Sequence, residues 1–361
     1  MTTESTTNDA AAMADAASAA LEKGAQDGDG AEPKSLGGLL KFLRKNSDGT
    51  NVVKETVKSF SNADGSDEKG DLIVQDAEDG LIKLKHLVES DKLALEFSKK
   101  SKDNEKAIRW EFRTSPHEQF GKTLDDTFRA FIIWSKTKDE DVVSGYNISK
   151  AFRRLASYAD WMEETGDDLT EPALSADSCK AALDAWAMKC SVASGGKEEG
   201  SAGSFCWWID LGAVDIKAVK KDIPPKDSLR SFVWYAHYVM YDENAQSNGI
   251  LFFESCGNVG FMDMMTMVPM KLGVKLDRLT IGVLPIKMKK FYILETPTWM
   301  DMLMKFMSMF MSKKMKSRIA VAKDWSVVEE AVGGKESIPK GFGPLDGSLE
   351  MDPVESKYFS S

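Results

Sequence analysis

The stretch KFYILETP, residues 290–297, is the strongest indicator of architecture in the sequence. Residues 290–295 read as a strand-like run, with four consecutive apolar or aromatic residues at 291–294. The run closes on Pro297, which cannot continue a central strand. Residues 299–311 then form an apolar helical segment with a single narrow polar stripe. A helix with so broad an apolar surface is either deeply buried or in contact with lipid.

Similar strand-like runs occur elsewhere in the second half of the chain. They cover residues 205–211, 249–254 and 318–322, and helical stretches separate them. Residues 229–241 hold helical spacing and follow a start signal at Pro224 and Pro225. This alternation predicts an α/β domain with a buried sheet. The glycine-rich stretch at 192–203 is predicted to be a linker or loop.

The first half of the chain has a different sequence pattern. Residues 116–191 are predicted to be helical, with one apolar face around Phe128 and another around Ile148, where Asn147 or Ser149 is a candidate cap. The segment at 73–106 is predicted to form small helices. We therefore divide the chain into five parts. Residues 1–37 are predicted to be a disordered tail, 38–115 a helical region of unknown role and 116–195 an N-terminal-like helical subdomain. Residues 200–345 are predicted to form the main domain, and 346–361 a flexible tail.

Composition argues against several functions. The net charge of −10 disfavours nucleic-acid binding, which needs a broad basic surface. The four cysteines show no C-x-x-C spacing, so we expect free thiols and no metal site. No secretory leader and no membrane span is recognisable, which favours a cytoplasmic location. The three histidines lie in unrelated segments and no nucleophile or phosphate-loop motif is complete, so no catalytic residues are predicted and an enzyme is not expected.

Methionine and basic residues concentrate near the quoted stretch. Thirteen of the nineteen methionines lie between Met262 and Met315. Methionine suits a surface that adapts to an irregular apolar partner, although two ordinary core helices would also explain it. Basic residues at 287–290 and 313–318 flank the apolar segment. They are either a solvated face or a docking site for anionic headgroups, each worth about 1 kcal/mol near a membrane surface.

Taken together, KFYILETP, the run NGILFFESCG at 248–257 and IPKGFG at 338–343 resemble the CRAL-TRIO family. Residues 125–164 resemble the helical subdomain that precedes its lipid-binding domain. The resemblance covers about residues 116–345. It implies an α/β fold in which a strand of this type leads into a mobile gate helix over a lipid cavity. One departure is Glu254, where an Asp is usual in the family.

The resemblance also implies a set of site residues. The pocket-lining positions fall on Leu229, Phe232, Ala236, Ile250, Phe253, Leu284, Met288 and Phe291. The gate-helix positions fall on Trp299, Met300, Leu303, Phe306, Met307 and Phe310. The positions that hold anionic headgroups fall on Lys287, Lys314 and Arg318. Members that carry phosphatidylinositol have an acidic residue and a Thr where this chain has Ile286 and Met315, which argues against phosphatidylinositol as the cavity ligand.

The resulting hypothesis is the binding of a single hydrophobic lipid, for transfer or sensing, with exchange at anionic membranes. It predicts a peripheral membrane association, a bound lipid and no other cofactor. The alternative is an interaction module on the same fold that binds a protein partner such as a small GTPase. The long N-terminal region is the expected contact for such a partner.

Overall fold

The computed structural model describes residues 72–98, 101–112, 117–137, 145–165, 169–171, 173–196, 202–257, 259–268, 273, 275–276, 278–301, 304 and 313–350. The tails predicted at 1–37 and, for the most part, at 346–361 lie outside these ranges. Within them, no helix combines the length and the apolar character needed to cross a membrane.

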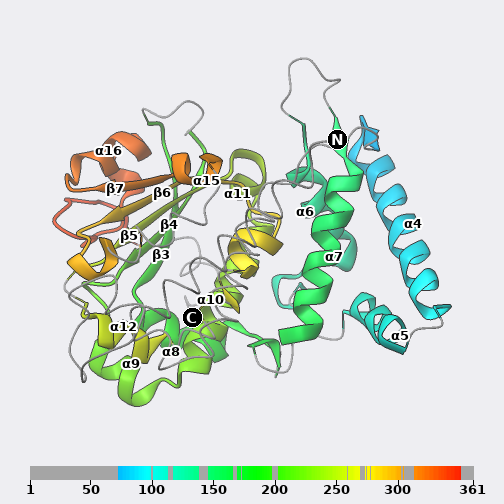
Figure 1. Ribbon diagram of the computed structural model, residues 1–361. Helices are drawn as coiled ribbons and strands as arrows, with labels where there is room; N and C mark the ends of the chain where they lie inside the picture. The colour runs from blue at the N-terminus through cyan, green and yellow to red at the C-terminus, as the bar shows by residue number, and fades with distance from the viewer. Residues whose placement is uncertain are drawn as a thin grey trace, which may run out of the picture.

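One five-stranded sheet organises the second half of the chain (Figure 1). Its strands run in the order β3-β4-β5-β6-β7. β3 is antiparallel to β4, and the remaining pairs are parallel. The bounds are β3 Met188–Val192, β4 Phe205–Asp210, β5 Ile250–Ser255, β6 Met288–Leu294 and β7 Ile319–Ala322. The predicted α/β class is confirmed, and the four predicted strands are found within two residues at each end.

Helices connect the parallel strands and cover both faces. The connections are α9 Ile216–Asp222, α10 Pro225–Tyr241, α11 Glu243–Asn248, α12 Phe261–Met267, the helical turn η4 Arg278–Val283 and α15 Lys313–Arg318. α10 packs on the face that includes Trp207, whose ring stacks on Tyr235 at a centroid distance of 4.9 Å. α16 Ser326–Val332 packs on the opposite face through Val328 and Val332.

A helical unit lies beyond α10, on the side away from the sheet (Figure 1). Its elements are β1 Ile73–Val74, α4 Ala77–Glu96, α5 Ser101–Ala107, η1 Ile108–Glu111, η2 Glu118–Phe120, α6 Leu124–Trp134, β2 Tyr146–Asn147 and α7 Ile148–Thr165. α8 Ala176–Ala185 lies against α10 instead. Asn147 caps α7, because its Oδ1 accepts from the Lys150 N–H at 2.8 Å. The Ser149 hydroxyl instead accepts from the Leu72 N–H.

Two sequence predictions about this half are wrong. Met188–Val192 is a strand of the main sheet, not the end of a helical block. The small helices predicted within 73–106 are largely one helix of 20 residues, α4. In both cases packing decides the conformation: β3 pairs along β4, and Leu81, Leu84 and Val88 of α4 are buried against the neighbouring helices.

The core contains the one histidine that lies within α10. His237 is fully buried, its Nδ1 lies 2.7 Å from Val233 O and its Nε2 lies 2.9 Å from the Tyr158 hydroxyl. Burial lowers the pKa of His237 to about 4. With both ring nitrogens partnered inside the core, His237 is a structural residue. All four cysteines are buried and free, which confirms the expected thiols.

Candidate functional site

Two aromatic ladders run across the sheet, one on each face. On one face Trp207 of β4 is in register with Phe252 of β5, which is in register with Phe291 of β6. On the other face Trp208, Phe253 and Tyr292 hold the next positions of the same strands. Side chains of consecutive strand residues point to opposite faces, so each strand contributes one ring to each ladder.

The ladder of Trp208, Phe253 and Tyr292 is closed, and we call its side of the sheet the sealed face. Trp208 stacks on Phe253 at 4.2 Å and 12°, and Phe253 stacks on Tyr292 at 5.0 Å and 5°. Phe342 covers Trp208 edge-on at 4.9 Å. The three ladder rings are at most 2 % exposed. No ligand can reach this face without unfolding the layer that covers it.

The other ladder, on what we call the open face, is not fully covered. Trp207 is buried, but Phe252, Phe291 and the next residue in register, Ile319 of β7, are only partly buried. Phe252 contacts Trp207 at 5.2 Å and Phe291 at 4.8 Å. Other partly buried apolar side chains border the same face: Phe232, Met264 and Met288. Accessible apolar surface in the middle of a domain marks a place for an apolar partner.

The predicted gate segment begins directly over this face. Residues 298–301 and 304 are helical, and the Met300 and Asp301 N–H groups donate to Pro297 O. Trp299 and Met300 are buried in a cluster with Ile293 of β6 and Phe261 of α12. Phe291 and Ile319 pack against the same cluster. The start of the predicted gate therefore lies at the border of the open face.

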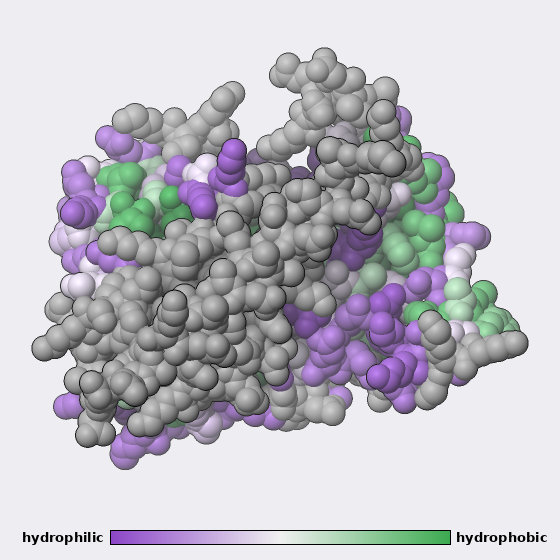
Figure 2. Space-filling view, viewed as in Figure 1, coloured by the Kyte–Doolittle hydropathy of each residue, from purple (hydrophilic) through white to green (hydrophobic). Residues whose placement is uncertain are grey.

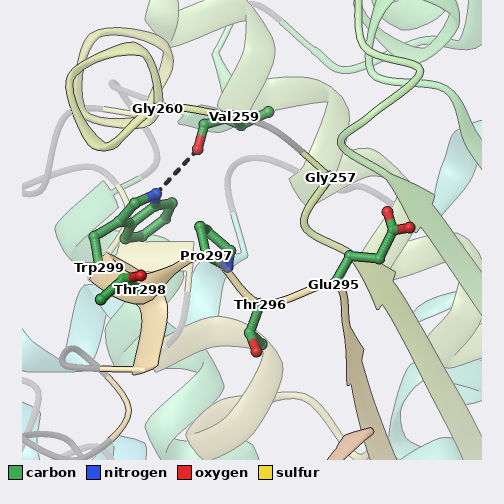
Figure 3. Close-up of a pocket in the computed structure, with 8 residues that line it drawn as sticks. All are labelled: Gly257, Val259, Gly260, Glu295, Thr296, Pro297, Thr298 and Trp299. Atoms are coloured by element: carbon green, nitrogen blue, oxygen red, sulfur yellow. Dashed lines mark hydrogen bonds between the residues drawn. The ribbon is translucent and has the colours of Figure 1, made fainter. Parts of the chain in front are cut away.

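A hollow of about 610 Å³ adjoins this point, beyond the carboxyl ends of β5 and β6 (Figure 3). It is lined by Gly257, Val259, Gly260, Glu295, Thr296, Pro297, Thr298 and Trp299. The Trp299 indole N–H donates to Val259 O at 3.0 Å and so ties the gate to the loop after β5. Parallel α/β sheets typically bind ligands beyond the carboxyl ends of their strands, and the volume suits a small-molecule site.

The surroundings of this hollow are acidic. Burial, and then the carboxylates of Glu254, Glu295 and Asp301, raise the pKa of the Cys256 thiol far above its usual range. Glu295 adopts a left-handed conformation at φ 49°, and its carboxylate accepts from the Ser255 hydroxyl at 3.3 Å. Because Cys256 stays protonated, it cannot serve as a nucleophile.

Four of the predicted pocket residues are packed in the core. Leu229, Ala236, Ile250 and Leu284 are at most 1 % exposed and belong to the main hydrophobic cluster. A water-sized space at these side chains would leave them measurable exposure, so no such space adjoins them here. Phe232, Met288 and Phe291 are the three predicted residues that stay partly exposed near the open face.

Phe253 cannot line a pocket shared with the other predicted residues. It lies on the sealed face, whereas Ile250 belongs to the cluster on the α10 side. The two positions are three residues apart in β5, and an odd spacing places side chains on opposite faces of a strand. Phe252 occupies the open face instead. The sequence analysis missed it, although its even spacing from Ile250 was a usable signal.

The remaining predicted residues are only partly described. Leu303, Phe306, Met307 and Phe310 of the predicted gate lie outside the described residues, as does the Lys314 side chain. Lys287 precedes β6 and its Nζ donates to Ile133 O at 3.3 Å. Arg318 ends α15 and directly precedes β7. Since β6 and β7 are parallel, Lys287 and Arg318 lie at the same, amino-terminal edge of the sheet.

Two buried indole nitrogens, Trp186 Nε1 and Trp207 Nε1, have no hydrogen-bond partner among the described residues. Trp186 contacts Phe232 edge-on at 5.1 Å, and Trp207 contacts Phe252. An indole N–H can only donate, and leaving a buried donor unpaired costs about 1–3 kcal/mol. A ligand oxygen would satisfy such a donor.

Among the described residues, no group of three or more His, Cys, Asp or Glu side chains could hold a metal ion. Burial lowers the pKa of His117, which directly precedes η2, and the pKa of His237 in α10. Neither lies among the residues that line the hollow beyond β5 and β6.

Comparison with known proteins gives one match to a family model and a similar solved structure. The fold is an α/β domain whose sheet has one sealed face and one partly covered apolar face. The family model described as the CRAL/TRIO domain matches residues 195–343. A solved structure titled "Crystal structure of Sfh5" superposes with a TM-score of 0.41 at 13 % identity, covering 77 % of this chain and 90 % of that chain. No curated protein sequence matches.

The chain therefore contains a CRAL/TRIO domain, which confirms the resemblance seen in the sequence. The matched region runs from the loop before β4 to the segment after α16 and holds both ladders. CRAL/TRIO domains are lipid-binding and lipid-transfer domains, so lipid binding or transfer is the general function of this part of the chain.

Proposed function

We propose that the chain binds a single lipid on the open face of the sheet, under a gate formed by residues 299–311. The observation that carries this proposal is the difference between the two ladders. In-register rings of the same three strands are closed on the sealed face and left partly exposed on the open face. Trp299 and Met300 begin the gate at the border of the exposed rings.

The energy available to such a site is large. Each buried CH₂ group contributes about 0.8 kcal/mol, so an acyl chain of about sixteen carbons supplies roughly 12 kcal/mol before losses. The same quantity opposes release of the lipid into water. Exchange is therefore proposed to occur at a membrane, where the gate opens and its apolar side chains enter the interface.

The position of three basic residues supports the proposal of exchange at a membrane. Lys287, Lys314 and Arg318 belong to the amino-terminal edge of the sheet, where the described chain returns from the gate through α15. We propose that this edge contacts anionic lipid headgroups. The chain as a whole is acidic, so attraction would be limited to this local cluster.

The unpaired donors indicate which lipids suit the site. Trp186 and Trp207 present indole N–H groups next to Phe232 and Phe252, the partly exposed rings of the open face. We propose that the ligand carries oxygen acceptors, such as ester carbonyls, that these donors recognise. The proposal includes no catalytic step.

Native mass spectrometry of the purified full chain tests the central claim. A stoichiometric lipid is expected with the natural sequence, and Phe252→Ser combined with Phe291→Ser should reduce its occupancy. Val321→Ser is the matched control, because Val321 is 47 % exposed on the edge strand β7. Absence of any stoichiometric lipid, before and after incubation with mixed vesicles, would favour the alternative of a protein-interaction module.

A further inference from the structure

Helix α4 carries apolar side chains on two sides, and among the described residues only one side is packed against other elements. Leu81, Leu84 and Val88 are at most 6 % exposed and face the neighbouring helices. On the other side Ile82, Leu93 and Phe97 are 69 %, 49 % and 82 % exposed. A surface helix normally carries one apolar face and one polar face. We therefore expect another segment or protein to cover the second apolar side of α4.

These exposed apolar residues, which we call the α4 stripe, lie on one side of α4. Leu93 and Phe97 are one turn apart, and Ile82 lies about 16 Å further along the helix, beyond the exposed His86 and Glu89. At 100° per residue, Leu93 and Phe97 lie about 20° and 60° around the helix from Ile82. The stripe is thus on one side of α4, opposite its buried residues. Figure 2 shows hydrophobic surface along the edge of the molecule that α4 forms in Figure 1. Glu89 and Glu96, both exposed, border the stripe.

The chain itself supplies a matching segment. Residues 36–45 read LGGLLKFLRK, with Leu36, Leu39, Leu40 and Leu43 at the spacing of one helical face. The segment carries Lys41, Arg44 and Lys45 and no acidic residue. Apolar side chains therefore match the α4 stripe, and the basic residues match its acidic border.

The length of chain between segment and stripe also fits. Residues 46–71 separate the segment from Leu72, which immediately precedes β1 and α4. A flexible chain of that length has a root-mean-square span of about 28 Å. α4 has 20 residues and is about 30 Å long. A tether whose span matches the distance gives an effective concentration in the millimolar range.

We infer that residues 36–45 of this chain dock on the α4 stripe, with Leu39 and Leu43 against Leu93 and Phe97. The docking is intramolecular and reversible, and it covers apolar surface that would otherwise face water. A second copy of the chain or a different protein would use the same surface only by displacing this segment. The inference is independent of lipid binding, because the stripe lies on the far side of the helical unit from the sheet (Figure 1).

Distance measurement in the full chain tests this inference. The native cysteines are buried, so Ser47→Cys and Ser90→Cys provide two accessible sites for spin labels. Pulsed electron–electron double resonance should show a narrow short-distance population. Leu39→Ser with Leu43→Ser should abolish it, and Leu93→Ser with Phe97→Ser should abolish it equally. Val53→Ser with Val57→Ser, in the tether, should leave it unchanged.

Two results would overturn the inference. One is a broad distribution in the natural sequence that none of these substitutions alters. The other is a short-distance population that disappears when labelled protein is diluted with unlabelled protein, since that contact would join two copies. Circular dichroism and the melting temperature should stay within a few degrees for every variant, because all substituted side chains on α4 are exposed. Ile82→Ser is a further α4 variant if Phe97→Ser perturbs folding.

Discussion

The indole N–H of Trp299 donates to the backbone oxygen of Val259 at 3.0 Å, and this bond joins the start of the proposed gate to the loop after β5. Both residues also line the hollow beyond the carboxyl ends of β5 and β6. If residues 299–311 act as the proposed gate, opening at this end has to break the bond. We therefore expect the contact to contribute to the barrier for the proposed lipid exchange.

Trp299→Phe is expected to accelerate lipid exchange. The substitution keeps an aromatic ring in the cluster with Phe261 and removes one buried hydrogen bond, worth about 1 kcal/mol. Transfer of a fluorescent phospholipid between vesicles should become several-fold faster. Trp325→Phe, on the sealed-face side, is the control. Equal transfer rates for natural and Trp299→Phe protein would show that the bond does not limit gate opening.

Phe253→Ala should destabilise the domain more than Phe252→Ala does. Phe253 is fully buried between Trp208 and Tyr292, so its truncation leaves a cavity and costs about 3–5 kcal/mol. Phe252 is partly exposed and should cost less in stability but more in lipid binding. Denaturant unfolding and lipid occupancy, measured on both variants, separate the two roles. Equal losses in both measurements would contradict the assignment of the two faces.

Trp207→Phe should alter which lipids bind. Removing the unpaired indole N–H should abolish a preference for dipalmitoyl phosphatidylcholine over its dihexadecyl ether analogue, which lacks the ester carbonyls. One hydrogen bond of about 1 kcal/mol corresponds to roughly a fivefold preference. Trp208→Phe is the control, because Trp208 Nε1 donates to Ser191 Oγ on the sealed face. A preference that survives in Trp207→Phe would exclude this donor from recognition.

Acid should weaken the fold through His237. Its pKa is lowered from 6.5 to about 4 by burial in the folded chain, so the unfolded chain binds a proton more readily. Stability is full above pH 6.5 and falls as the pH drops towards 4, by up to about 3 kcal/mol. His237→Gln should flatten the free energy of unfolding over this pH range. A slope that is unchanged in the variant would assign the effect to other groups.

Charge reversal at the basic edge should slow transfer to anionic membranes. Lys314→Glu with Arg318→Glu removes two attractive charges and adds two repulsive ones, at about 1 kcal/mol for each lost charge. Transfer to vesicles rich in phosphatidylserine should fall, and transfer to neutral vesicles should not. Lys217→Glu with Lys221→Glu, on α9 at the opposite edge, is the control. An equal loss with the control pair would show that only net charge matters.

The strands of the domain were predictable because β4 to β6 are short apolar runs with glycine or proline nearby, and β7 is a short apolar run between Arg318 and Lys323. β3 was not, since MKCSV follows α8 after only Trp186 and Ala187 and carries no break signal. Face assignment was the harder problem. The sequence of β5, ILFFES, does not alternate between apolar and polar residues, so composition does not separate Phe252 from Phe253. The even spacing of Phe252 from Ile250 places the two on one face, and the register with β4 and β6 shows which face is only partly covered.

The site was predictable to a similar degree. The apolar pattern after Pro297 indicated that Trp299 and Met300 would pack on the domain, and both are buried beside β6, whereas their role in a gate stays a prediction. The packed state of Leu229 and Leu284 was not predictable, since core and cavity residues have the same composition. The unpaired indole of Trp207 depends on its three-dimensional surroundings, and no sequence pattern reports it.

The contrast between the faces of the sheet bears on how this domain can diverge. Trp208, Phe253 and Tyr292 form parallel stacked pairs, so a change in one ring requires matching changes in the others. Phe252 and Phe291 are only partly buried, so a change in either ring is less constrained by packing. Over evolutionary time, ligand preference can therefore drift through one side of the sheet while the other side keeps the fold intact.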